Sequence, residues 1–235
     1  MRRVWAVCRK ELLSYFSSPV AYIVSAVFLL IAGYFFTMVV SYTREAHLRF
    51  LFQNMAIIIL FIVPMITMRL FAEERKLGTF ELLMTSPIRL YELVAGKFLG
   101  AMALIGIILV VTLQYPLFLI GFGNPDLGPI ATGYLGFFLL CMAFAAVGIF
   151  ASSLTDSQIV AGAVSLCILL GFWIIGWAGD FLTGPSADFV RGLSLIDRLD
   201  NFVKGVVDTG DLAYYLSITG GFLFLTVRAL DWRRW

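Results

Sequence analysis

The strongest constraint on this chain is a set of long apolar runs that contain no charged side chain. Between Pro19 and Val40, 22 consecutive residues carry no charge. A helix rises about 1.5 Å per residue, so such a run can span the roughly 30 Å hydrocarbon core of a bilayer. Hydrophobic residues make up 61% of the chain, above the roughly 45–50% that is usual for soluble domains. We therefore expect membrane lipid to surround much of the protein.

We expect an all-α integral membrane protein with six transmembrane helices, because each segment in lipid must satisfy its own backbone hydrogen bonds. Residues 1–235 are expected to form a single transmembrane domain. The predicted spans are residues 19–40, 54–70, 92–120, 130–152, 159–178 and 212–228. Pro64 is expected to kink the second span, because proline removes a helical hydrogen bond.

Two further segments are expected to lie in the membrane interface. In residues 1–18, Trp5, Cys8, Leu12 and Phe16 recur at helical spacing, which predicts an interfacial helix; a plain cytosolic extension is the alternative. In residues 180–211, apolar residues recur at helical spacing among six aspartates. This pattern predicts one or two amphipathic helices on or in the interface.

The distribution of lysine and arginine predicts which side of the membrane each loop faces. Six spans place both termini on one side. That side, which includes the loop of residues 71–91, carries twelve of the 17 basic residues. Because basic residues concentrate in cytoplasmic loops, the termini and this loop are expected in the cytoplasm, and residues 180–211 outside.

The loop that follows the second span is the most charged interruption of the apolar sequence. It offers charge at Glu73-Glu74-Arg75-Lys76, a break at Gly78, and Thr79 as a cap for a short helix from Phe80 to Thr85. Such a helix, with apolar and charged faces at the mouths of two spans, suits docking into a cleft of a partner. A solvated loop with an interfacial helix explains the composition equally well.

The spans themselves disfavour an ion-driven carrier. They lack Asp, Glu, Lys, Arg and His near their centres, where such residues mark ion pathways. Lys97 lies near the start of the third span and is expected to snorkel to the surface as an anchor. Gly96 and Gly100 form a GxxxG pair, interpreted as a helix-packing contact. The net charge of +2 gives no support for nucleic-acid binding.

No catalytic or metal-binding motif is recognised in the sequence. His47, the single histidine, has no second ligand at zinc spacing, and the three cysteines are widely separated. There is no phosphate-binding loop, because Gly96-Lys97 is followed by phenylalanine. We therefore expect no cofactor in this chain and no enzymatic activity of its own, so the energy for any work must come from another chain.

Several segments resemble a known family. The segment from Phe71 to Ile88, followed by Val94-Ala-Gly-Lys-Phe98, resembles the loop between the second and third helices of ABC-2-type permeases, the membrane subunits of ABC exporters. Within that superfamily the sequence is most similar to the gliding-motility GldF type. Further similar segments are Arg9–Leu12, Ser152–Gln158, Asn201–Asp208, Tyr214–Ser217 and Trp232–Trp235.

This resemblance implies a permease that works with cytosolic ABC ATPase subunits, which bind ATP and Mg. It also implies a second permease copy or a related permease, a possible extracytoplasmic auxiliary protein, and a location in the bacterial cytoplasmic (inner) membrane. The loop would be the coupling helix that contacts the ATPase, and residues near the start would form a connecting helix. By match to the motif, the coupling residues are Glu73, Glu74, Arg75, Gly78, Thr79, Glu81, Leu82, Leu83 and Pro87, and the connecting residues are Arg9, Lys10 and Glu11.

Two other functions remain open at this stage. A non-transporting scaffold would only anchor an extracytoplasmic partner, and its important part would be residues 180–211. An ion-coupled carrier or channel would need charged residues inside the spans. The transported substrate, if there is one, and the direction of movement do not follow from the sequence.

Overall fold

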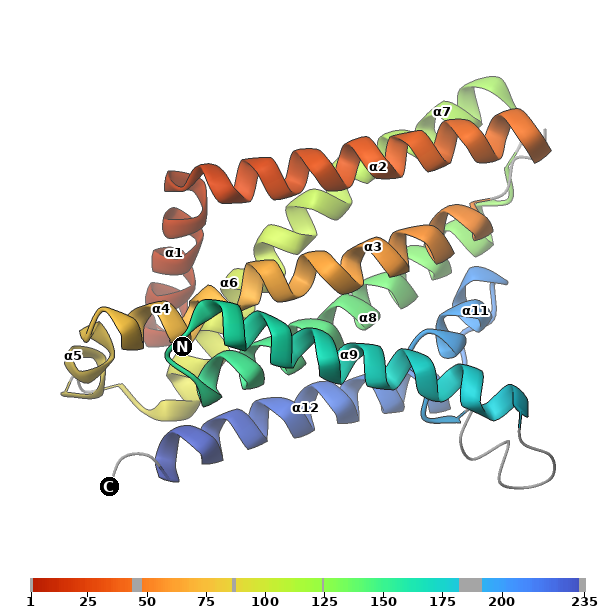
Figure 1. The fold of residues 1–235 in the computed structure, drawn as a ribbon. Coiled ribbons are helices and arrows are strands. Elements are labelled where there is room, and N and C mark those ends of the chain that lie inside the picture. The colour runs from red at the N-terminus through yellow and green to blue at the C-terminus, as the bar shows by residue number, and fades with distance from the viewer. Residues whose placement is uncertain (1, 44–47, 86–87, 124, 182–191, 233–235) are drawn as a thin grey trace.

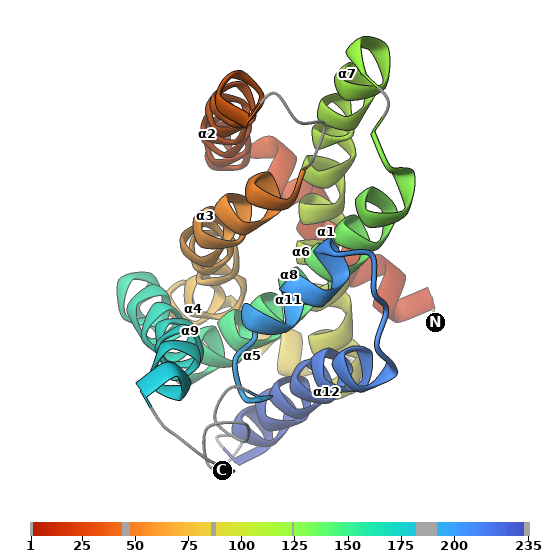
Figure 2. The same ribbon diagram turned by 90° about the vertical axis from the view of Figure 1, so that its right-hand side faces the viewer.

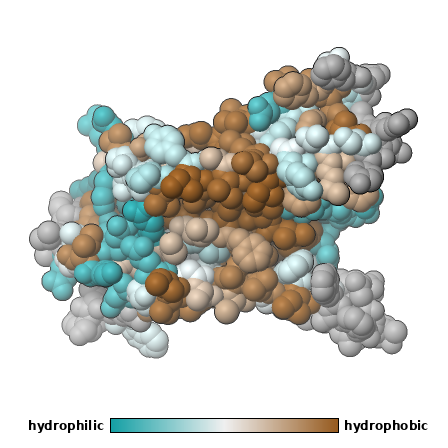
Figure 3. Space-filling view, turned by 45° about the horizontal axis from the view of Figure 1, so that its top comes forward, coloured by the Kyte–Doolittle hydropathy of each residue, from teal (hydrophilic) through white to brown (hydrophobic). Residues whose placement is uncertain are grey.

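The structure is a computed structural model that describes residues 2–43, 48–85, 88–123, 125–181 and 192–232 (Figure 1). The described part is all-helical, and six of its helical segments are long and apolar enough to cross a membrane. The expected all-α architecture with six spans is therefore confirmed. On the face shown in Figure 3, apolar residues form a band across the middle, and polar residues gather toward the ends.

The first half of the chain builds one end of the bundle and three of the spans. Its helices are α1 (Arg2–Ser17), α2 (Pro19–Thr43), α3 (Arg49–Thr67), α4 (Arg69–Lys76), α5 (Thr79–Thr85), α6 (Leu90–Thr112) and α7 (Gln114–Phe122). α1 lies across the end of the bundle instead of continuing the direction of α2 (Figure 1).

The second half adds the central helix and the opposite end. Its helices are α8 (Leu127–Leu154), α9 (Gln158–Phe181), α11 (Asp197–Val203) and α12 (Thr209–Trp232). α8 packs against α3, α6, α9, α11 and α12. In the most apolar 18-residue segment of α8, 78% of the residues are buried, whereas in the corresponding segments of α2 and α12 only 17% are buried. The core therefore surrounds α8, which lies among the other helices (Figure 2). The outer helices keep exposed apolar residues for lipid or for another chain.

The second and third spans are each interrupted by a short break. α3 runs unbroken through Pro64, and the helix is interrupted four residues later, at Met68. The third span is interrupted at Leu113, just before Pro116. Pro116 has no N–H for the carbonyl of Thr112, and the Tyr134 hydroxyl donates to that carbonyl instead, at 2.9 Å.

Several helices begin earlier than the sequence suggests, and aspartate caps mark the early starts of two of them. The second span begins at Arg49 instead of residue 54. α8 begins at Leu127, where the Asp126 carboxylate accepts a hydrogen bond from the Gly128 N–H at 3.1 Å. Asp208 does the same for Gly210 at the start of α12, at 2.9 Å. Aspartate is a favoured N-cap because its oxygen satisfies a free backbone N–H.

The segment after the fifth span differs from expectation in the direction of its apolar face. Leu199, Phe202 and Val203 of α11 are buried, and α11 packs against α3 and α8. Asp200 forms an ion pair with Arg49 at 2.8 Å, and Asp211 forms an ion pair with Arg198 at 2.5 Å. The apolar ridge of α11 therefore faces protein, and the position of this segment in the membrane interface stays a prediction. Residues 182–191 of this segment lie outside the described residues.

The basic residues that the sequence assigns to the cytoplasmic side and those that it assigns to the external side lie, where they are described, at opposite ends of the bundle. The start of α1, all of α4, the start of α6 and the end of α12 lie together at one end (Figure 1). The starts of α3 and α12 lie with α11 at the other end. We call the first the α5 end and the second the α11 end.

Candidate functional site

α4 and α5 form a tight corner at the α5 end. The N–H groups of Leu77 and Gly78 close the last turn of α4 by donating to Glu73 and Arg75 carbonyls, both at 3.0 Å. Gly78 then adopts a φ of +70°, a left-handed conformation that favours glycine. A Cβ at this position would touch nothing within 4 Å, so the backbone conformation alone selects glycine. The predicted break at Gly78 is confirmed.

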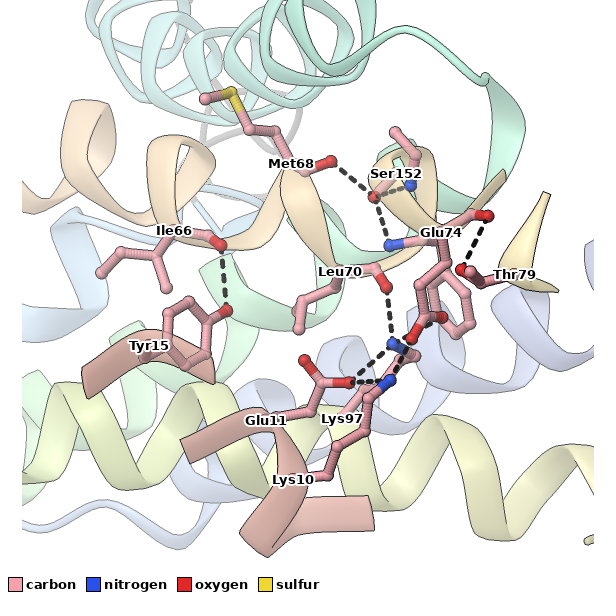
Figure 4. Close-up of polar contacts among 12 residues, drawn as sticks. Lys10, Glu11, Tyr15, Ile66, Met68, Leu70, Glu74, Thr79, Lys97 and Ser152 are labelled. Carbon is pink, nitrogen blue, oxygen red and sulfur yellow. Dashed lines mark hydrogen bonds and ion pairs between the residues drawn. The ribbon is translucent and has the colours of Figure 1, made fainter. Parts of the chain in front are cut away.

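The predicted short helix is present as α5, but it begins at Thr79 instead of Phe80, and the Thr79 side chain contacts the preceding helix. Its hydroxyl donates to the Glu74 carbonyl at 3.1 Å, which ties the start of α5 to the end of α4 (Figure 4). α5 also rests on α4 through aromatic contact. The Phe80 ring meets the buried Phe71 ring edge-on, with centroids 6.2 Å apart, and the Arg75 guanidinium lies over Phe80 at 5.1 Å.

The predicted coupling residues divide into two groups. Glu74, Arg75 and Leu83 face neighbouring parts of the protein, whereas Thr79 and Glu81 are exposed. Leu77, which sequence reasoning did not single out, is 67% exposed beside them. Glu73 pairs with Arg69 at 2.9 Å on the surface of α4. Pro87 and the side chain of Leu82 lie outside what the structure describes.

The most unexpected feature of the site is Lys97. Its side chain is completely buried, and its Nζ forms ion pairs with Glu11 of α1 and Glu74 of α4, both at 2.8 Å (Figure 4). Nζ also donates to the Leu70 carbonyl at 2.6 Å and lies 5.0 Å from the centre of the Phe71 ring. The expectation that Lys97 snorkels to the surface is wrong, because two carboxylates from other helices meet it inside the protein.

The connecting residues of α1 have different surroundings. Arg9 is exposed. Lys10 is about half exposed and pairs with Glu74 at 2.5 Å and Glu11 at 3.6 Å. Burial lowers the pKa of Lys10, but the hydrogen bond to Glu74 and the charges of Glu74 and Glu11 outweigh burial and raise its pKa. Lys10, Glu11, Glu74 and Lys97 thus form a neutral four-charge cluster that joins α1, α4 and α6. We call it the Lys97 cluster.

α1 reaches Lys97 because α6 has glycines where the two helices cross. A Cβ on Gly96 would lie 2.6 Å from the Val7 Cβ, and one on Gly100 would lie 2.8 Å from the Glu11 Cβ. The GxxxG pair is therefore a packing contact, as predicted, with α1 as its partner. The buried face of α1 consists of Val7, Cys8, Glu11 and Tyr15, whereas Trp5 and Phe16 of the predicted apolar face are exposed.

Ser152, at the end of α8, supports the start of α4. Its hydroxyl oxygen accepts hydrogen bonds from the N–H groups of Phe71 and Ala72, at 3.0 and 3.1 Å, and it donates to the Met68 carbonyl at 2.8 Å (Figure 4). These three hydrogen bonds fix the backbone at the interruption at Met68. Sequence reasoning did not find this role, although Ser152 ends an apolar run and begins a segment, Ser152–Gln158, that resembles the family.

Other contacts hold the corner against its neighbours. Arg75 also pairs with Asp156, in the turn between α8 and α9, at 3.6 Å. The Tyr15 hydroxyl donates to the Ile66 carbonyl at 3.0 Å, and burial, followed by the charge of Glu11, raises the pKa of Tyr15. A cavity of about 330 Å³ lies between α1 and α4, and Tyr15, Lys10 and Glu73 line part of it. The corner is thus fastened to α1, α3 and α8.

The site is a set of ion pairs and packed side chains that joins α1, α4, α5 and α6. Its charged groups form ion pairs with one another across three helices, and the exposed residues of α5 lie at the end of the bundle. Within the described ranges, no group of three or more His, Cys, Asp or Glu residues is arranged to hold a metal ion. The arrangement suits transmission of a contact at α5 into the bundle.

Comparison with known proteins identifies the family. The family model described as "ABC-2 family transporter protein" matches residues 5–205, which include the whole α4–α5 corner and the Lys97 cluster. None of the curated proteins compared with the chain matches it significantly. The chain belongs to the ABC-2 family of transporter proteins and is a membrane permease component of an ABC transporter. Members of this family generally work with an ABC ATPase subunit and lack an ATPase site themselves.

Proposed function

We propose that this ABC-2 permease receives the motion of a cytosolic ABC ATPase through the corner of α4 and α5. ATP and Mg²⁺ would bind to the ATPase subunits, and the permease would use the motion for export or for work on an extracytoplasmic partner. The same proposal includes the gliding-motility GldF type, the bacterial inner membrane, and pairing with a second copy or a related permease. These finer assignments rest on the resemblance of the loop and the C-terminal segments.

The observation that carries the proposal is the shape of the corner. Leu77, just before α5, and Thr79 and Glu81 of α5 are exposed, while Phe80 of α5 rests on buried Phe71. A surface that combines an exposed apolar side chain with charge at a fixed angle is suited to a protein cleft. Because the backbone of this corner is held by contacts with the spans, a displacement of α5 would be transmitted to the spans.

The charge distribution supports a cytoplasmic position for this surface. At the α5 end, α1 contributes Arg2, Arg3, Arg9 and Lys10, and α4 contributes Arg69, Arg75 and Lys76. An excess of lysine and arginine near span ends favours the cytoplasmic side. A cytosolic ATPase would then meet α5 directly.

The docking test substitutes only exposed residues, because such substitutions should not disturb folding. The permease would be coexpressed with an ABC ATPase from the same organism, one that carries the phosphate-binding sequence Gly-x-x-x-x-Gly-Lys-Ser/Thr. The double variant Leu77→Asp/Glu81→Lys should abolish copurification of that ATPase, because it adds charge to the apolar contact and reverses the neighbouring charge. Val206→Asp at the α11 end, where Val206 is 57% exposed, is the matched control and should retain it.

Normal copurification and ATP turnover with the double variant would refute docking at this corner. The same result would leave a scaffold as the alternative function, with the α11 end as its important part. There, Asp200 and Asp211 already pair with arginines of this chain, so a partner would contact exposed Asp197, Val206 or Asp208.

A further inference from the structure

Lys97 lies where three elements of the α5 end meet. It belongs to α6, and its ion pairs reach Glu11 of α1 and Glu74 of α4 (Figure 4). The side chains of Glu11 and Glu74 are only 9% and 12% exposed, and that of Lys97 is fully buried. These three residues are far apart in the sequence, so no single segment could hold the charges together.

We propose that Lys97 is a positioning residue that makes α1, α4 and α6 move together when the ATPase changes state. The proposal rests on the proposed function, because it assumes that the ATPase contacts α5. Through Lys97, a movement of the α4–α5 corner would be passed on to α6, in the third span.

The energetics of buried charge support a positioning role. A buried ion pair often adds little stability beyond that of an apolar replacement, but removal of one partner leaves an uncompensated buried charge. Sliding α4 along α6 would separate Lys97 from Glu74, and lifting α1 would separate it from Glu11. The charges therefore penalise arrangements in which any one helix moves alone, whereas an apolar contact tolerates sliding.

A continuous line of contacts joins α5 to Lys97. Phe80 of α5 packs on Phe71 of α4, and Nζ of Lys97 lies over the same Phe71 ring. The Phe71 N–H is held by Ser152 of α8 at 3.0 Å. A displacement of α5 thus reaches Lys97 through one buried ring whose backbone is fixed. The test therefore measures a response at a distance from α5.

The experiment measures amide hydrogen exchange in the purified permease–ATPase complex, with and without ATP. In the native complex, ATP should change exchange in α5 and also in peptides of α6 and α7. In Lys97→Met, the ATPase should remain bound and the change in α5 should persist, because Leu77 and Glu81 are intact. The change in α6 and α7 should be lost.

Three further variants separate positioning from general stability. Lys97→Arg keeps the charge and should restore a remote change. The triple variant Lys97→Met/Glu11→Gln/Glu74→Gln removes the charge from all three side chains. It should fold and bind the ATPase even if Lys97→Met alone does not. The ATP-dependent change of exchange in α6 and α7 should still be absent. Lys204→Met removes a lysine that pairs with Asp200 at the α11 end, and it should behave as the native protein.

The outcomes distinguish the two proposals. A native-like change in α6 and α7, in Lys97→Met or in the triple variant, would overturn the role of Lys97. A native complex in which α5 responds to ATP but α6 and α7 do not would overturn it as well. Failure of the native permease to bind the ATPase, or of α5 to respond at all, would instead refute the proposed function.

Discussion

Ser152 and Lys97 show how single polar side chains organise the α5 end. Ser152 supplies three hydrogen bonds at the interruption between α3 and α4, and Lys97 supplies two ion pairs across three helices. Both are buried, and a buried polar group is stabilising only when its partners are in place. Small changes at these positions should therefore have large effects.

At the residue scale, we predict that Ser152→Ala destabilises the protein more than Ser153→Ala. Ser152→Ala removes the hydroxyl that accepts from the N–H groups of Phe71 and Ala72. An unsatisfied buried group lowers the free energy of unfolding by about 1–3 kcal/mol. Ser153 is equally buried, but its hydroxyl bonds a carbonyl of its own helix, that of Phe150. Unfolding of both variants in detergent would measure the difference, and equal losses would contradict the role of Ser152.

The crossing of α1 and α6 is the element-scale feature on which the cluster depends. α1 lies across the end of the bundle, and the glycines of α6 let it approach closely enough for Glu11 to reach Lys97. A side chain at the crossing would separate the helices. The same change elsewhere on α6 would be harmless if space is available.

At the element scale, we predict that Gly100→Val is destabilising and that Gly106→Val is tolerated. The first added Cβ would lie 2.8 Å from the Glu11 Cβ, whereas a Cβ on Gly106 meets nothing within 4 Å. Overpacking of this kind costs about 1–3 kcal/mol. Thermal unfolding of the two variants in detergent is the measurement. A Gly100→Val protein as stable as Gly106→Val would mean that α1 does not pack on α6 in this way.

The whole molecule is polar at both ends and apolar between them, and the two ends differ in charge. The α5 end carries most of the basic residues, while the α11 end joins Asp200 and Asp211 to arginines of its own chain. This asymmetry favours one orientation in the membrane.

At the scale of the whole molecule, we predict that Val206 faces outward and Leu77 faces the cytoplasm. In a version whose native cysteines are replaced by alanine, a membrane-impermeant maleimide should label Val206→Cys in intact cells. Leu77→Cys should be labelled only after the membrane is opened. Both side chains are well exposed, at 57% and 67%, so accessibility within the protein is matched. Labelling in the opposite order would reverse the orientation.

The sequence by itself determined the features that are encoded locally. The number of spans follows from the length of uncharged runs, and the corner at Gly78 follows from a glycine at the end of a charged helix. The motif at the α4–α5 corner also indicated the family before any contact was known. Each of these depends on neighbouring residues, so each can be recognised along the chain.

Only the tertiary structure decided which polar groups turn inward. Glu11, Glu74 and Lys97 come from three separate segments, and a lysine near a span end has the same pattern whether it reaches water or a buried carboxylate. The apolar ridge of α11 likewise has one pattern for lipid and for protein, and it packs on protein. Amphipathic spacing states which face is apolar, but the packing of distant helices decides what covers it.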